Sequence, residues 1–252
     1  MNQTICKNCD NRFEGQYCNV CGQSSKVERI NSHYLMNEIS NNFFQLDRGF
    51  FFTARALFTR PGQCVGDFLM GKRRRYAKPL TYLLLTATLY AIVTYLLGLN
   101  TFSQDFATGF AIGVSDKGSE HGHEIVNALN WLAEKYAYTV LFTLPFFSLG
   151  SYVAFFKSGH NYFEHVILNM YITGQQMLVY LCLSFFVIKD NMTEILPLAG
   201  GIIFNFWAFY QFFKIGGGFT KLLLTLVTYG LFMVQMLGLI TIGVILIDEL
   251  HL

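Results

Sequence analysis

Four cysteines near the start of the chain have the residue type and spacing best suited to a chemical role. Cys6 and Cys9 form one Cys-x2-Cys pair, and Cys18 and Cys21 form a second pair after eight intervening residues. Two such pairs can hold one ion in a tetrahedron of thiolates with Zn–S distances of about 2.3 Å. Because four thiolates leave no open coordination position, the pattern predicts a single structural zinc ion. An iron–sulfur cluster and a pair of disulfides are the alternatives.

The predicted head, residues 1–26, depends on that metal for its fold. It offers Ile5, Phe13, Tyr17 and Val20 for an apolar core, whereas ordering about 20 residues costs roughly 30 kcal/mol of conformational entropy. Zinc sites in small peptides contribute about 10–16 kcal/mol at neutral pH. The short spacing between the two pairs predicts a miniature zinc-ribbon-like head.

Five apolar segments in residues 80–252 predict an all-α integral membrane protein. The chain is 53% hydrophobic and only 13% charged. A spanning helix needs about 20 apolar residues, because the hydrocarbon layer is about 30 Å thick and each helical residue rises about 1.5 Å. All five segments lack Asp, Glu, Lys, Arg and His. The predicted spans are 80–99, 136–156, 166–188, 195–213 and 222–247.

The distribution of charge predicts the orientation of these spans. Twelve of the 18 basic residues and six of the 16 acidic residues precede Leu80, which gives this portion a net charge of +6. Basic residues near membrane spans favour the cytoplasmic side. The sequence therefore predicts a multi-pass protein of the bacterial cytoplasmic (inner) membrane with a cytoplasmic N-terminus. A reducing cytoplasm disfavours the disulfide alternative.

Residues 27–79 connect the head to the first span. Apolar positions recur at helical spacing, and Gly49 and the triplet at 60–62 interrupt them, which predicts two or three short amphipathic helices. The piece at 50–58 combines phenylalanines with arginines. It is expected either to lie in the lipid headgroup layer or to pack against the inner ends of the spans.

Five basic residues stand directly before the first span. Each is expected to gain about 1 kcal/mol from anionic headgroups, which predicts a lipid-binding run. Nucleic-acid binding is disfavoured, because membrane topology already accounts for basic residues at this position. The run consists of Lys72, Arg73, Arg74, Arg75 and Lys78.

His160, Glu164 and His165 form a candidate polar cluster before the third span. Positions 160 and 164 share a helix face, so their side chains could bind an ion or exchange a proton. A hydrogen-bonded helix start is the structural alternative.

Several motifs together resemble a bacterial membrane family named domain of unknown function 3667. They are CKNC at 6–9, FEGQYC at 13–18, CGQ at 21–23, the pattern from Arg48 to Leu80 and NYFEH at 161–165. The resemblance implies a zinc-ribbon-headed polytopic membrane protein and implies no defined activity.

Three classes of function fit the sequence. The favoured hypothesis is a non-enzymatic scaffold or regulator whose head docks a protein partner at the membrane. A small transporter or channel is the alternative, although the five spans lack the buried charge that ion-coupled carriers usually keep. A membrane enzyme is the third, with Glu164 and His165 among its few candidate residues. The oligomeric state is not predicted.

Overall fold

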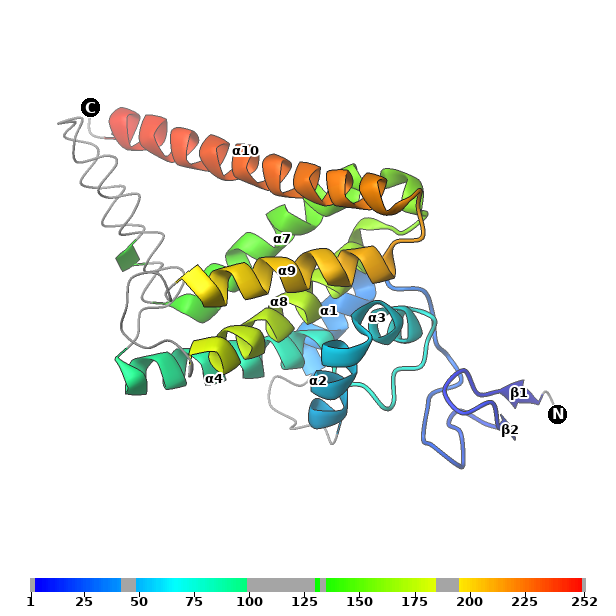
Figure 1. The fold of residues 1–252 in the computed structure, drawn as a ribbon. Coiled ribbons are helices and arrows are strands. Elements are labelled where there is room, and N and C mark those ends of the chain that lie inside the picture. Colours follow the sequence, from blue (N-terminus) through cyan, green and yellow to red (C-terminus); the bar gives the residue numbers. More distant parts are fainter. Residues whose placement is uncertain (1–2, 42–48, 99–129, 132–134, 185–194, 251–252) are drawn as a thin grey trace.

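The computed structural model describes residues 3–41, 49–98, 130–131, 135–184 and 195–250. Within these ranges the chain is mostly helical and carries a small sheet near its start (Figure 1). Strand β1, Thr4–Ile5, pairs antiparallel with β2, Arg12–Phe13, with Thr4 opposite Phe13. The head lies to one side of the helices (Figure 1).

Three short helices connect the head to the first long helix. They are α1, Ser32–Asn41, α2, Phe50–Thr59, and α3, Pro61–Leu69. Pro61 starts α3 well, because its fixed φ suits the first helical position and its missing N–H would find no helical acceptor there. Next to it, Gly62 lets α3 lie directly against α9, since a Cβ on Gly62 would stand 2.5 Å from the carbonyl carbon of Gln211.

Among the described residues, five longer helices form the body of the protein, and α8 lies at its centre. It packs against α4, α7 and α9, whereas α10 packs against α7 and α9 and leaves most of its surface exposed. The helices are α4, Pro79–Leu97, α7, Tyr136–Ala154, α8, Tyr162–Ser184, α9, Ile195–Phe212, and α10, Gly218–Leu250; a 3-10 turn, η1, Phe156–Ser158, follows α7.

Three of the described helices are long and apolar enough to cross a membrane. They are α4, α8 and residues 218–243 of α10. The predicted spans 136–156 and 195–213 coincide with α7 and α9, but the described residues of these two helices, taken alone, do not meet the same test of length and composition. The length and composition of these three helices indicate a membrane protein. The predicted count of five spans is not confirmed. The last residues of the predicted spans 80–99 and 166–188 lie outside the described residues.

Candidate metal centre and polar clusters

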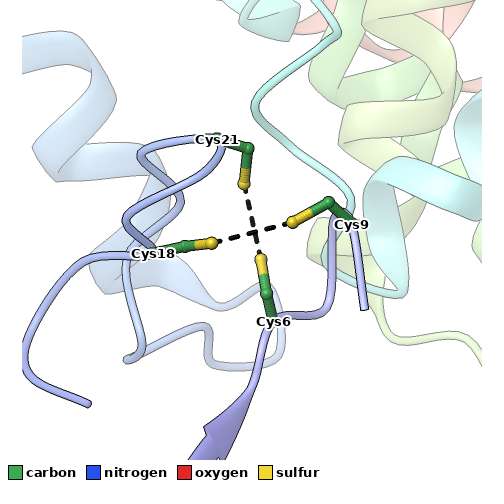
Figure 2. A group of neighbouring side chains, drawn as sticks. All are labelled: Cys6, Cys9, Cys18 and Cys21. Carbon is green, nitrogen blue, oxygen red and sulfur yellow. Dashed lines mark hydrogen bonds between the residues drawn. The ribbon is translucent and has the colours of Figure 1, made fainter. Parts of the chain in front are cut away.

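The four head cysteines converge on one point, as the sequence predicts (Figure 2). Their sulfurs lie within 4.8 Å of one another, with 3.5 Å between Cys6 and Cys21 and 3.6 Å between Cys9 and Cys18. A ZnS4 tetrahedron has sulfur–sulfur edges of about 3.8 Å. All four cysteines are free thiols, so the group fits a metal ion, and this donor set alone does not select zinc over iron.

The two halves of the site share one backbone pattern. In the first, the N–H of Asp10 donates to the carbonyl of Cys6, and the N–H of Cys6 donates to that of Asn11. In the second, Gly22 donates to Cys18, and Cys18 donates to Gln23. Asp10 and Gly22 occupy equivalent positions, and both have a positive φ. Each Cys-x2-Cys pair is thus one copy of the same metal-binding turn.

The electrostatics of the four sulfurs favour the binding of a cation. Burial opposes ionisation of Cys18, but N–H groups of Cys21 and Val20 outweigh it and lower its pKa to about 6. At Cys9 the N–H of Asn11 lowers the pKa, whereas burial and the neighbouring sulfurs raise it to about 12. Four adjacent thiols therefore do not all ionise by themselves, and a bound cation would supply the missing charge.

The apolar core predicted for the head is mostly wrong. Phe13 is buried against Cys6 and Cys18. Ile5, Tyr17 and Val20, in contrast, are 58, 65 and 68% exposed. The four sulfurs take the place of a core, because so small a segment cannot enclose three more large side chains.

One metal-binding turn contacts Gly71, directly before the basic run, and the other contacts Arg74 within the run. Lys7, in the first turn, donates from Nζ to the carbonyl of Val27 at 2.9 Å. Its side chain covers Gly71, where an added Cβ would lie 3.0 Å from Lys7 Cδ. In the second turn Gly22 faces the guanidinium of Arg74. The head is therefore seated on residues 71–74.

Glu164 is fully engaged at the start of α8. Its Oε2 accepts the N–H of Asn161 at 2.9 Å, and Oδ1 of Asn161 accepts the N–H of Glu164 at 2.9 Å, which is a reciprocal helix cap. Arg29 donates to both carboxylate oxygens at 2.7 and 2.8 Å, and His160 Nδ1 lies 3.3 Å from Oε2. Hydrogen bonding to Glu164 raises the pKa of Arg29.

His165 turns away from this cap and joins a buried network between α7 and α8. Its Nδ1 lies 3.0 Å from Ser151 Oγ, and Asn169 donates from Nδ2 to Ser151 at 3.0 Å and to Ser148 at 3.2 Å. The distance between Ser151 and His165 suits a nucleophile and its base, but both side chains are buried. In this conformation the pair stabilises packing and is closed to a substrate.

Some side chains of the predicted lipid-binding run have partners within the protein, and others are exposed. Lys72 pairs with Asp67 at 3.0 Å. Arg73 lies over the ring of Tyr34 at 4.7 Å and donates to the carbonyl of Glu28 at 2.7 Å, so the first two members brace the protein itself. Arg74 and Arg75 are exposed, and Lys78 is half-buried before α4.

The family described as Protein of unknown function (DUF3667) matches residues 47–91. The resemblance is therefore confirmed over α2, α3 and much of α4. No curated protein and no solved structure matches the chain.

The matched segment contains buried polar residues that the sequence analysis did not single out. Asp67 accepts a hydrogen bond from the Tyr76 hydroxyl at 3.2 Å. Outside the segment, Glu38 reaches it from α1 and accepts the N–H of Leu80 at 3.1 Å. Both are acidic residues that stand within the apolar stripe of a helix, and that pattern could have indicated that their carboxylates are buried.

Two glutamines of α8 hold helices together. Gln175 accepts a hydrogen bond from the hydroxyl of Tyr82 on α4. Gln176 donates to the carbonyl of Gly201 on α9 at 2.9 Å. These contacts are typical of amides that join helices inside a membrane.

Proposed function

We propose that this protein is a non-enzymatic membrane scaffold or regulator whose metal-binding head docks a protein partner. The observation that carries the proposal is the exposure of Ile5, Tyr17 and Val20 on a head held together by four cysteines. Exposed aromatic and aliphatic side chains on a rigid support are the groups that anchor protein interfaces. The metal would act by fixing this surface, and zinc suits the role because it has no redox chemistry.

The proposal places the protein in a bacterial cytoplasmic membrane with five spans, α4, α7, α8, α9 and α10. The head would then face the cytoplasm. Support comes from the basic residues that accompany the head and precede α4, as the positive-inside rule requires. An odd number of spans would bring the chain end beyond α10 to the opposite side.

Affinity capture with metal analysis tests the docking role. Wild-type protein and Cys182→Ser, which removes an exposed cysteine of α8, are expected to carry about one zinc ion per chain and to retain the same partner. Cys18→Ser is expected to lose both. A double change, Tyr17→Ser with Val20→Ser, should lose the partner and keep the metal. A partner retained by both Cys18→Ser and the double variant would refute docking through the head.

The internal contacts of α8 weaken the other two classes. Glu164 is engaged by Arg29 and Asn161, and His165 is buried, so neither of these two candidates of the membrane-enzyme hypothesis is an accessible acid or base. Transport would require Gln175 or Gln176 to bind a solute, and both join neighbouring helices instead.

A further inference from the structure

One face of α2 is exposed, whereas the opposite face is packed against the rest of the described structure. Thr53, Ala56 and Leu57 are buried against the rest of the protein. Phe51, Arg55 and Phe58 are exposed, and their spacing of four and three residues places them on one helix face. Phe51 is 82% exposed and Phe58 42% exposed. A short helix thus presents two aromatic rings and a cation outward.

Several contacts fix α2 beside the start of α4. A Cβ on Gly49 would stand 2.8 Å from the carbonyl oxygen of Arg75, so the two backbones touch. Thr53 Oγ1 accepts the N–H of Ala77 at 2.8 Å. The ring of Phe50 packs against Tyr82 in the first turns of α4, with 5.3 Å between centroids. In Figure 1, α2 lies beside the head-side end of α4.

This position coincides with a membrane boundary. Helix α4 is long and apolar enough to span, so its first turn lies where the hydrocarbon layer meets the headgroups. Aromatic side chains concentrate at that level, and interfacial helices combine such rings with Lys or Arg. On and beside the exposed face, Arg55, Arg60 and Arg75 supply positive charge, and Arg75 lies 5.8 Å from the ring of Phe52.

We propose that the exposed face of α2, formed by Phe51, Arg55 and Phe58, binds the surface of an anionic phospholipid bilayer. The two rings enter the boundary between headgroups and acyl chains, and Arg55 pairs with a lipid phosphate. Lys72 and Arg73 hold internal partners, so α2 takes over part of the lipid contact predicted for the basic run. The proposal requires α4 to span and is independent of the head and its metal.

Photocrosslinking in lipid nanodiscs tests this surface directly. The full chain carries p-benzoylphenylalanine at position 51 or 58, in discs of equal phosphatidylglycerol and phosphatidylcholine, and mass spectrometry identifies the adducts. Lipid adducts are expected from both positions. The matched control is position 17 on the head, which is 65% exposed and should give none. Crosslinks to a second copy or a soluble protein, or no lipid adduct above the level at position 17, would overturn the proposal.

The charge of Arg55 provides a second test. With the crosslinker at position 51, Arg55→Gln should lower the ratio of phosphatidylglycerol to phosphatidylcholine adducts about fivefold. Arg12 is an exposed arginine of the head, and Arg12→Gln should leave the adduct ratio unchanged. An equal adduct ratio in the Arg55→Gln and Arg12→Gln proteins would exclude a contact between Arg55 and the lipid headgroups. If the labelled chain does not fold, Phe51→Trp gives an independent readout. Its emission should be quenched by brominated phosphatidylglycerol beyond the wild-type level, and no added quenching would contradict the proposal.

Discussion

The guanidinium of Arg29 donates two hydrogen bonds, of 2.7 and 2.8 Å, to the carboxylate of Glu164, which lies 135 positions later in the chain. Arg29 is largely exposed and the Glu164 carboxylate is nearly buried. A second link runs alongside, since Asn161 donates to the carbonyl of Ile30 at 3.0 Å. Residues 29 and 30 thereby attach the segment behind the head to the start of α8.

Replacing Arg29 with Gln should destabilise the protein by about 1–3 kcal/mol, because the buried carboxylate loses its two charged hydrogen bonds. The measurement is thermal unfolding in detergent micelles. Arg12→Gln, which also removes one exposed arginine, is the control. Equal midpoints for the two variants would show that the Arg29 pair contributes nothing.

Removing the metal should unfold the head and leave the helices folded. The ion is expected to supply about 10–16 kcal/mol, which the single buried ring of Phe13 cannot replace. Limited trypsin digestion after treatment with a zinc chelator should therefore cut at Arg12 and Lys26 much faster than before. Added zinc should restore resistance. Cleavage at the same rate with and without metal would contradict a metal-dependent fold.

Glu38 should make stability fall as pH rises. Burial raises its pKa from 4.5 to about 7, although the N–H of Leu80 and the charges of Lys78 and Arg73, with the hydroxyl of Tyr34, favour the carboxylate. Between pH 4.5 and pH 7 the carboxyl group of Glu38 therefore keeps its proton in the folded state and loses it in the unfolded state. The contribution of Glu38 is thus complete below pH 4.5 and is lost by pH 7, a change of about 3 kcal/mol.

The comparison that isolates this effect is Glu38→Gln. Chemical unfolding of both proteins from pH 5 to pH 8 should show wild-type stability declining relative to the variant. Loss of metal from the head at low pH affects both proteins equally. A constant difference across this range would exclude titration of Glu38.

Gly62→Ala should destabilise the protein by about 1–3 kcal/mol, because the new methyl group would overlap the backbone of Gln211 and push α3 away from α9. Gly66→Ala on the same helix is the matched control. Its Cβ would meet nothing within 4 Å, so helix propensity should make that change neutral or stabilising by up to about 1 kcal/mol. Similar effects of the two changes on the unfolding midpoint would argue against close contact between α3 and α9.

The metal site was predictable because its ligands are local. Four cysteines within 16 residues determine their own partners by spacing, and the structure brings all four together. The exposure of Tyr17 and Val20 was not predictable from hydrophobicity, since a metal site removes the need for a core. The start of α8, four residues before the predicted span, follows from the spacing of Asn161 and Glu164, which is typical of a reciprocal cap.

The long-range contacts could not be read from the sequence. Nothing in the residues around Arg29 points to Glu164, because the pairing depends on how α8 packs among its neighbours. In the same way, the run at 72–75 is uniform in charge, yet Lys72 and Arg73 have internal partners while Arg74 and Arg75 are exposed. Which charges are occupied internally is decided by tertiary structure.

The pair between Arg29 and Glu164 also sets an order of events during synthesis. At about 5–20 residues per second, translation of the 135 residues between them takes roughly 7–27 s. Helix α4 is completed about halfway through that interval, and until its end the segment behind the head has no Glu164 to bind. Its attachment is therefore a late step in biogenesis, and it marks the arrival of α8 in the growing protein.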